Sequence, residues 1–295
     1  MKSEIIPWTA RFSAGRCPCG SGKFARKCCW RGRGQWEKSP VGPIKVSGSN
    51  FKHPRCYLSS LGNCSTKITR EHFISRNILQ RITNSTLKFE NAAHFFGGKA
   101  NVEIGVDAFS SKILCDNHNS SLSILDASAG LTFDIIESFA ADAVKGFTGH
   151  STVKAFCVAS GLDVERWLIK VHCGLVATGK IRSHSGRILA KEPLQDLLYQ
   201  TLMGNASLFS PLGLHMHTRV GQNLHPGRIS FSTVQLTDGS DDVGGLMMSL
   251  GILNFVLITS PRFGQTFTEP NWYRHQCLSW NAKRGGSRLG FLFTY

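Results

Sequence analysis

Apolar residues recur every three or four positions in several segments of the chain, and this spacing predicts helices. A short helix is expected over residues 73–82, and a longer one from about 119 to 144. We expect a further helical region over 153–161 and 164–179, and a short helix within 192–204, where Glu192 and Pro193 suit a first turn. The longer helix would present one apolar face made of Leu122, Leu125, Phe133, Ile136 and Ala140.

The pattern changes after about residue 211. Short apolar runs rich in β-branched and aromatic residues alternate there with Gly- and Asp-rich turns, which predicts strands. These runs cover 213–220, 228–237, 246–260 and 287–295. Helices therefore come first and strands later, so we predict an α+β fold whose C-terminal part, residues 149–295, is an α/β domain ending in mainly antiparallel strands.

The first 52 residues show neither the helical spacing of apolar residues nor the short apolar runs typical of strands. Residues 1–38 contain almost no repeated apolar spacing, so this segment needs a cross-link to fold. Residues 39–52 are rich in Pro, Gly and Ser and are expected to form a linker. Residues 53–148 then form a separate predicted domain.

The cross-link in the first segment is supplied by cysteines. The stretch "RCPCGSGKFARKCC", residues 16–29, contains Cys17, Cys19, Cys28 and Cys29. Four thiolates can enclose a zinc ion tetrahedrally, and the intervening glycines allow the tight backbone that this requires. The stretch resembles the SEC-C motif, a small zinc-binding element attached to many proteins, and the resemblance implies a zinc-held docking element rather than an enzyme.

The net charge of the chain indicates what kind of partner it binds. The chain of 295 residues has 34 Lys and Arg against 19 Asp and Glu, a net charge of +15. Such a surplus favours nucleic acid as a partner. The longest apolar stretch, 246–259, is shorter than the ~20 residues of a membrane-spanning helix, so we expect a soluble, cytoplasmic protein with no membrane partner.

A second group of metal-binding residue types lies in residues 53–148. Cys115-x-x-His118 has the spacing of a zinc half-site, and Cys56 with Cys64 can supply the other half. The remaining cysteines, Cys157, Cys173 and Cys277, stand singly among apolar residues and are expected in the core.

Next to this group stand residues suited to phosphodiester hydrolysis. Glu71 and His72 offer an oxygen ligand and an imidazole side by side, and Asn119 offers an amide oxygen near the start of the long helix. Hydrolysis needs a base for the attacking water and a cation that stabilises charge on the phosphate. Oxygen ligands of this kind suit Mg²⁺ or Mn²⁺, whereas the sulfur ligands suit zinc.

Residues 53–126 resemble the HNH nuclease family, whose core is two strands and a helix around one metal. The Glu71-His72 pair matches the family's acid-histidine pair, and Cys115 to Asn119 matches its C-terminal motif, with His118 in place of a zinc cysteine. Ser110 stands where the family has a further Asn. The resemblance implies a ββα-metal core, His72 as general base, and Glu71 and Asn119 as ligands of the catalytic Mg²⁺ or Mn²⁺.

Two functions therefore remain open. The first is an HNH-type endonuclease acting on nucleic acid, most simply double-stranded DNA, with two structural zinc ions and a regulatory protein partner to restrain it. The second is a non-catalytic, zinc-stapled adaptor that binds nucleic acid or protein. In the adaptor, both cysteine groups are structural and His72 is an ordinary polar residue.

Other polar residues have a simpler explanation. His215 and His217, with His225 nearby, are expected at the surface rather than as ligands, and Asp126 is expected to be solvated rather than bonded to the site. Aromatic and basic residues near the C-terminus either grip nucleic acid or pack a terminal sheet; they are Trp272, Tyr273, Arg274, His275, Trp280, Lys283, Arg284 and Arg288.

Overall fold

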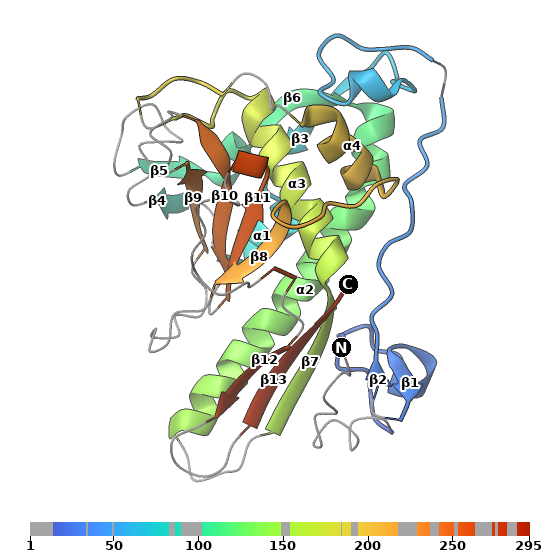
Figure 1. The fold of residues 1–295 in the computed structure, drawn as a ribbon, viewed down its shortest axis with the longest axis vertical. Helices are drawn as coiled ribbons and strands as arrows, with labels where there is room; N and C mark the ends of the chain where they lie inside the picture. Colours follow the sequence, from blue (N-terminus) through green and yellow to red (C-terminus); the bar gives the residue numbers. More distant parts are fainter. Residues whose placement is uncertain are drawn as a thin grey trace.

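A computed structural model defines the fold for most of the chain (Figure 1). It describes residues 14–33, 35–48, 50–82, 86–89, 102–148, 154–183, 185–189, 194–217, 229–236, 242–250, 253–262, 273–274, 277–281 and 288–295. Both helices and strands are present, with the strands in several small sheets, so the α+β prediction is confirmed.

Two strands and a long helix form the centre of residues 53–148. Strand β3 (Ile68–His72) pairs antiparallel with β6 (Ser110–Cys115), so that Ile68 lies opposite Cys115 and His72 opposite Ser110. Helix α2 (Asp116–Thr148) follows β6 directly and is longer at both ends than the sequence predicts. Between the strands lie α1 (Arg76–Ile82) and an antiparallel pair, β4 (Thr86–Phe89) and β5 (Val102–Gly105).

Helix α3 (Gly161–Ala177) lies in the interior, with nearly all of its residues buried. It packs against α2, against α4 (Gln195–Met203) and against a four-stranded antiparallel sheet. That sheet has the order β8-β11-β10-β9. Its strands are β8 (Gly213–His217), β9 (Ile229–Gln235), β10 (Val243–Leu250) and β11 (Leu253–Ile258). The apolar run 246–260, expected as one segment, thus contributes to two neighbouring strands.

The helical prediction for 153–161 is wrong. Residues Lys154–Ser160 form strand β7, which lies parallel to β13 (Arg288–Thr294), itself paired antiparallel with β12 (Cys277–Asn281). The partner strand comes from the far end of the chain, so local spacing carried no information about this pairing. This sheet lies along the C-terminal half of α2 (Figure 1).

The N-terminal knuckle, described over residues 14–33 and 35–38, is docked on the rest of the protein. It contains the short strands β1 (Trp30–Gly32) and β2 (Gln35–Trp36), and it packs around Val158 of β7. The backbone N–H of Val158 donates to the carbonyl of Pro18 at 3.3 Å. The knuckle therefore has a fixed seat beside the β7 edge of the three-stranded sheet.

The stretch expected to be a linker packs as a strap, residues 39–48, along the helices. The N–H of Val41 donates to Asp163 at 2.8 Å, and the N–H of Ile44 donates to the carbonyl of Met203 at 2.8 Å. Arg166 donates back to the carbonyls of Val41 and Gly42. In Figure 1 the strap runs from the knuckle to the opposite end of the molecule, where the chain enters the residues before β3.

One apolar core extends across the expected boundary at residue 148. It includes Leu122 and Phe133 of α2, Trp167 of α3, Phe255 of β11 and Phe293 of β13. The two predicted domains therefore share a single interior. None of the helices in the described ranges is long and apolar enough to cross a membrane.

Candidate metal centres and the Glu71 network

The structure brings the four N-terminal cysteines together. We call Cys17, Cys19, Cys28 and Cys29 the tetracysteine group; their sulfurs all lie within 4.8 Å of one another. The Sγ atoms of Cys19 and Cys28 are 3.5 Å apart, and those of Cys28 and Cys29 are 3.7 Å apart. A tetrahedron with zinc–sulfur bonds of ~2.3 Å has edges of about 3.8 Å, so the group has the right size for a zinc ion.

The surroundings favour the thiolate form of one member, Cys19. Hydrogen bonds from Cys29 and Ser21 lower the pKa of Cys19 to about 4, although burial opposes this shift. A thiolate is the form of cysteine that binds zinc. The tetracysteine group thus fits a zinc ion in donor type and distance.

Gly20 fixes the contact between the knuckle and α2. Its φ is +72°, a left-handed conformation that favours glycine. A Cβ at this position would also lie 3.0 Å from a side-chain carbon of Leu131 and 3.2 Å from one of Ile135. The glycine in the "CGSG" run therefore serves both the turn and the close approach of the knuckle to the helix.

The unaltered protein is expected to contain two zinc ions per chain, and the Cys17→Ser variant one. Serine oxygen is a poor zinc ligand, and the other group is built from different residues. Metal analysis of the purified protein by plasma mass spectrometry measures this directly. A zinc content that stays at two, or falls to zero, would contradict two independent sites.

The second group is equally compact. We call Cys56, Cys64, Cys115 and His118 the cysteine–histidine group; all four are buried, and their ligand atoms lie within 4.8 Å of one another. The three sulfurs surround one atom, Nδ1 of His118, at 3.5 Å from Cys56, 3.7 Å from Cys64 and 3.1 Å from Cys115. Burial lowers the pKa of His118, so its imidazole is in the neutral form that binds metal. This group also fits a zinc ion.

The cysteine–histidine group joins three parts of the chain that are distant in sequence. Cys56 and Cys64 come from the segment after the strap, Cys115 ends β6, and His118 lies in the first turn of α2. Asn117, between the last two ligands, donates to the carbonyls of Ser47 at 2.9 Å and Asn63 at 3.1 Å. The group therefore ties the end of the two-stranded sheet and the start of α2 to the segment that carries Cys56 and Cys64, and Asn117 adds the end of the strap.

Glu71 lies in the interior, where it is only 4% exposed. Its Oε1 forms an ion pair with Nζ of Lys170, a fully buried residue of α3. Burial raises the pKa of Glu71 to about 7, and the neighbouring ammonium opposes that shift. Although burial disfavours charge on Lys170 as well, the two carboxylates around it raise its pKa.

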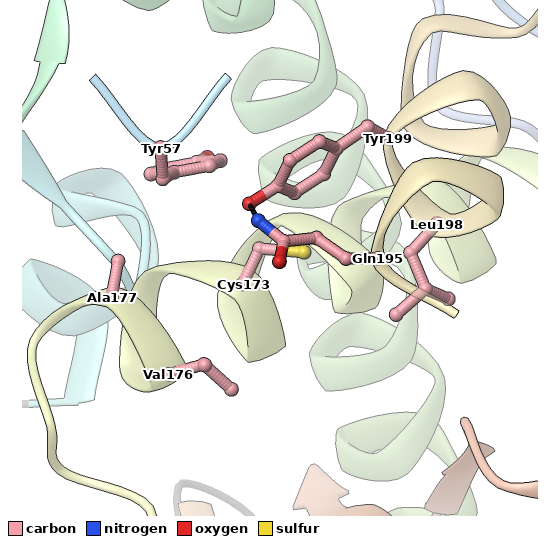
Figure 2. A pocket seen from close by; sticks show the side chains of 7 residues that line it. All are labelled: Tyr57, Cys173, Val176, Ala177, Gln195, Leu198 and Tyr199. Atoms are coloured by element: carbon pink, nitrogen blue, oxygen red, sulfur yellow. Dashed lines mark hydrogen bonds between the residues drawn. The ribbon is translucent and has the colours of Figure 1, made fainter. Parts of the chain in front are cut away.

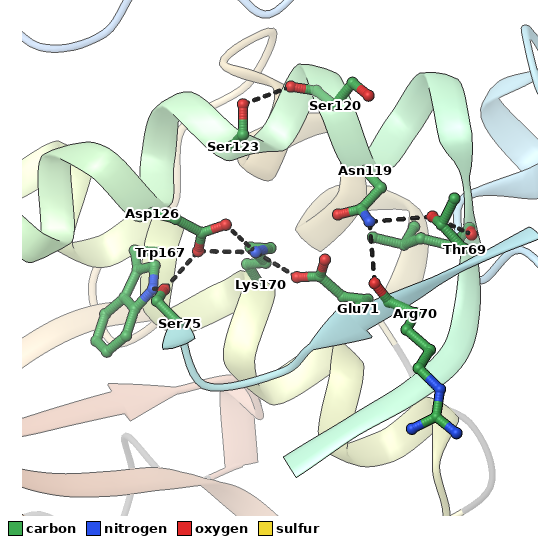
Figure 3. A network of polar contacts seen from close by, with 11 residues as sticks. Thr69, Arg70, Glu71, Ser75, Asn119, Ser120, Ser123, Asp126, Trp167 and Lys170 are labelled. Atoms are coloured by element: carbon green, nitrogen blue, oxygen red, sulfur yellow. Dashed lines mark hydrogen bonds and ion pairs between the residues drawn. The ribbon is translucent and has the colours of Figure 1, made fainter. Parts of the chain in front are cut away.

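The second of these carboxylates belongs to Asp126 of α2. Both of its oxygens accept from Nζ of Lys170, at 2.8 and 2.6 Å, and Oδ1 also accepts from the hydroxyl of Ser75. The indole N–H of Trp167 donates to that hydroxyl at 2.6 Å. The prediction of a solvated Asp126 is therefore wrong. We call the connected side chains of Glu71, Lys170, Asp126, Ser75 and Trp167 the Glu71 network (Figure 3).

Asn119 lies beside this network. Its amide nitrogen donates to the hydroxyl of Thr69 at 3.0 Å and to the carbonyl of Arg70 at 3.2 Å, which orients the side chain across β3. Figure 3 shows the amide oxygen of Asn119 and the carboxylate of Glu71 on the same side of β3, beneath the first turns of α2. Two oxygens that the sequence suggested as metal ligands are thus brought together.

His72 occupies the other side of the strand. Consecutive residues of a strand point to opposite faces, so His72 is directed away from Glu71. Its Nε2 lies 3.8 Å from a carboxylate oxygen of Asp107, and its side chain is 21% exposed. Burial lowers the pKa of His72, and Arg76 adds to this effect, which leaves a neutral imidazole at neutral pH.

Sequence reasoning missed the cationic partner of this site. Lys170 lies in an apolar stretch of α3, between Ile169 and Val171. A charged residue in such a stretch indicates a buried charge that needs a partner, and this was the signal available in the sequence. Asp107, the neighbour of His72, comes from the turn before β6 and had no comparable signal.

The remaining candidates have structural roles where they are described. Arg274 pairs with the buried Glu165 at 2.8 Å, and His215 is buried against Tyr273 rather than exposed as expected. Cys173 is buried as predicted and Cys157 is half-buried. Outside the described residues or side chains lie His217, His225, Trp272, His275, Cys277, Trp280, Lys283, Arg284 and Arg288.

Comparison with known proteins gives no counterpart for these sites. The chain matches no family model, no curated protein and no solved structure. The functional argument therefore depends on the residues described above.

Proposed function

We propose that the protein is a metal-dependent endonuclease of the HNH type that hydrolyses phosphodiester bonds, with DNA as its substrate. One observation carries the proposal. The cysteine–histidine group holds β6 and the start of α2 so that the side-chain oxygens of Glu71 of β3 and Asn119 of α2 lie on the same side of β3, with His72 next to Glu71 in the sequence. Two strands, a helix and this set of side chains are the parts that such a nuclease needs.

The charge of the Glu71 network fits a divalent cation beside it. Two carboxylates face one ammonium, so the network has one net negative charge when Glu71 is ionised. A cation bound beside Glu71 would favour that ionised form, whose pKa burial raises to about 7. Glu71 and Asn119 would be the protein ligands of Mg²⁺ or Mn²⁺, with oxygen donors of the type these ions prefer. When bound, the cation would stabilise negative charge on the scissile phosphate.

His72 would accept the proton of the attacking water. Because its side chain is on the face of β3 opposite Glu71, this role requires the water to lie at the end of the strand, where His72 is the last residue. Its lowered pKa keeps the imidazole neutral, which is the form that can take a proton. Asp107, at 3.8 Å from Nε2, would stabilise the imidazolium that results.

The surface of the knuckle supplies contacts for a nucleic acid backbone. It exposes six basic side chains, and Arg31 is the member of this set that is paired with an acid, Glu37. Phe24, among them, is 53% exposed and lies under the guanidinium of Arg16 at 4.9 Å. The six are Arg16, Lys23, Arg26, Lys27, Arg31 and Arg33. Phosphate contacts of this kind would make binding weaken steeply with salt.

A second candidate, a zinc-stapled adaptor without catalytic activity, is favoured by a different observation. The carboxylate of Glu71 is already paired with Lys170 in the interior, and His72 points to the opposite face of β3. In the adaptor the Glu71 network would be a structural element only. The two functions differ in whether bound DNA is cut.

The test is cleavage of supercoiled plasmid with Mg²⁺ or Mn²⁺ by the protein and by the His72→Ala variant. General base catalysis contributes ~10²–10⁴-fold, so the variant should cut slower by about that factor. Nicked and linear products are measured on gels as a time course, with filter binding of the same DNA at two salt concentrations.

The matched control is His53→Ala, which removes a half-buried histidine that belongs to neither metal group nor to the Glu71 network. It should cut at the rate of the unaltered protein. DNA binding without cleavage by every form of the protein would overturn the nuclease and support the adaptor. Equal cleavage by the His72→Ala variant would remove His72 from its assigned role.

A further inference from the structure

A cavity of about 170 Å³ lies between α3, α4 and the segment that carries the first ligands of the cysteine–histidine group (Figure 2). Val176, Ala177 and Leu198 give it an apolar wall. Tyr57, Tyr199, Gln195 and Cys173 supply its polar atoms, and Figure 2 shows Tyr57 and Tyr199 approaching the Gln195 amide from two sides. The roles assigned to Glu71, His72 and Asn119 do not use this cavity.

One polar atom in the cavity lacks a partner. The hydroxyl of Tyr57 is buried, and no described residue forms a hydrogen bond with it. A buried hydroxyl without a partner costs about 1–3 kcal/mol, so proteins rarely keep one without a use. By contrast, the hydroxyl of Tyr199 accepts a hydrogen bond from the amide nitrogen of Gln195.

The lining restricts the chemistry of an occupant. None of the lining side chains is charged, so a phosphate or carboxylate would lose its water without gaining a cation. A purely aliphatic molecule would leave the Tyr57 hydroxyl unpaired. Two tyrosine rings, those of Tyr57 and Tyr199, are part of the lining and contact each other with centroids 5.9 Å apart. A flat aromatic occupant can pack against such rings, because aromatic groups prefer offset or edge-to-face contacts with one another.

Size narrows the choice further. The volume is below the ~300–1,000 Å³ of pockets for drug-sized ligands, so it suits a single small ring system. The Tyr57 hydroxyl can donate to such a ring, and the Gln195 amide carries both a donor and an acceptor. The edge of a purine or pyrimidine base offers the matching groups.

We infer that this cavity binds a nucleobase, with the base edge hydrogen-bonded to Tyr57 and Gln195 and its ring against the two tyrosines. The inference goes beyond the proposed cleavage and does not require it. The base can belong to a free nucleobase or nucleoside, or to an unpaired position in a nucleic acid strand, and the recognition chemistry is the same for both.

The test is calorimetric titration of the full-length protein with adenine, cytosine and uracil, and with a single-stranded hexanucleotide of the base that binds best. At least one base or the hexanucleotide should bind more tightly than about 1 mM. In the Tyr57→Phe variant the affinity should fall about tenfold, the value of one hydrogen bond in a buried site. Because the lost hydroxyl has no described partner, this variant should fold with unchanged or higher stability, which thermal unfolding measures.

The control is Tyr273→Phe, which removes a hydroxyl that donates to the carbonyl of Leu208 at 2.9 Å, outside the cavity. It should leave the affinity unchanged. If the free base binds and its affinity depends on Tyr57, the occupant of the cavity is a small molecule. If only the hexanucleotide binds with an affinity that depends on Tyr57, the occupant is a base within a nucleic acid strand. No binding by any probe, or affinities equal in the Tyr57→Phe variant, would overturn the inference whether or not the protein cuts DNA.

Discussion

The Cys115→Ser variant is expected to lose the zinc ion of the cysteine–histidine group and at least about 4 kcal/mol of its free energy of unfolding. Cys115 is fully buried, and its sulfur lies 3.1 Å from the Nδ1 of His118. Without the metal, the ligand bonds that join β6, the start of α2 and the segment before β3 are lost, and hydrogen bonds such as that from Asn117 to the carbonyl of Asn63 remain. Urea unfolding followed by circular dichroism, together with zinc analysis, measures both effects.

The control for this variant is Cys157→Ser, which changes a half-buried cysteine outside both metal groups. It should keep two zinc ions and lose little stability. The Cys17→Ser change should cost less than Cys115→Ser, because the knuckle has its own small apolar cluster and the main core does not depend on it. If Cys115→Ser kept its zinc and its unfolding midpoint, the cysteine–histidine group would not be a metal site.

The second large effect is expected for Lys170→Met, which should lower the free energy of unfolding by about 3–5 kcal/mol. Methionine fills a similar volume but leaves the carboxylates of Glu71 and Asp126 without their cation in the interior. An uncompensated buried charge is far more costly than the loss of a surface ion pair. Urea unfolding at neutral pH measures the difference.

A double variant separates lost charge pairing from poor packing. Adding Glu71→Gln to Lys170→Met removes one of the two stranded charges and should restore part of the stability. Lys112→Met, an exposed position on β6, should change stability by no more than about 0.5 kcal/mol. If the double variant were less stable than Lys170→Met, the charge explanation would be wrong.

Lys170 also bears on the proposed activity. Its ammonium contacts one oxygen of Glu71, so a cation bound by Glu71 and Asn119 would use the other. The nuclease proposal thus requires one carboxylate to serve a lysine and a metal together. The plasmid assay decides whether the protein cuts DNA with this arrangement, or whether Glu71 and Lys170 only stabilise the fold.

Some features of this protein were determined by the sequence alone. Both cysteine groups could be predicted, because close spacing of soft ligands is a local property and the metal demands a fixed geometry. Helices α2, α3 and α4 and most C-terminal strands also followed from apolar spacing. The α+β class followed from the order of those segments.

Other features were decided only by tertiary contacts. Strand β7 was mistaken for a helix because its partner, β13, lies at the other end of the chain. The Pro-, Gly- and Ser-rich strap looked like a linker, yet its backbone bonds to Asp163 and Met203 hold it in place. The apolar spacing of α3 did not indicate the partners of its buried charged residues. Lys170 pairs with Glu71 of β3 and Asp126 of α2, and Glu165 pairs with Arg274. Metal ligands can be recognised by type and spacing, whereas a buried ion pair or a distant strand is defined by the partner that folding brings to it.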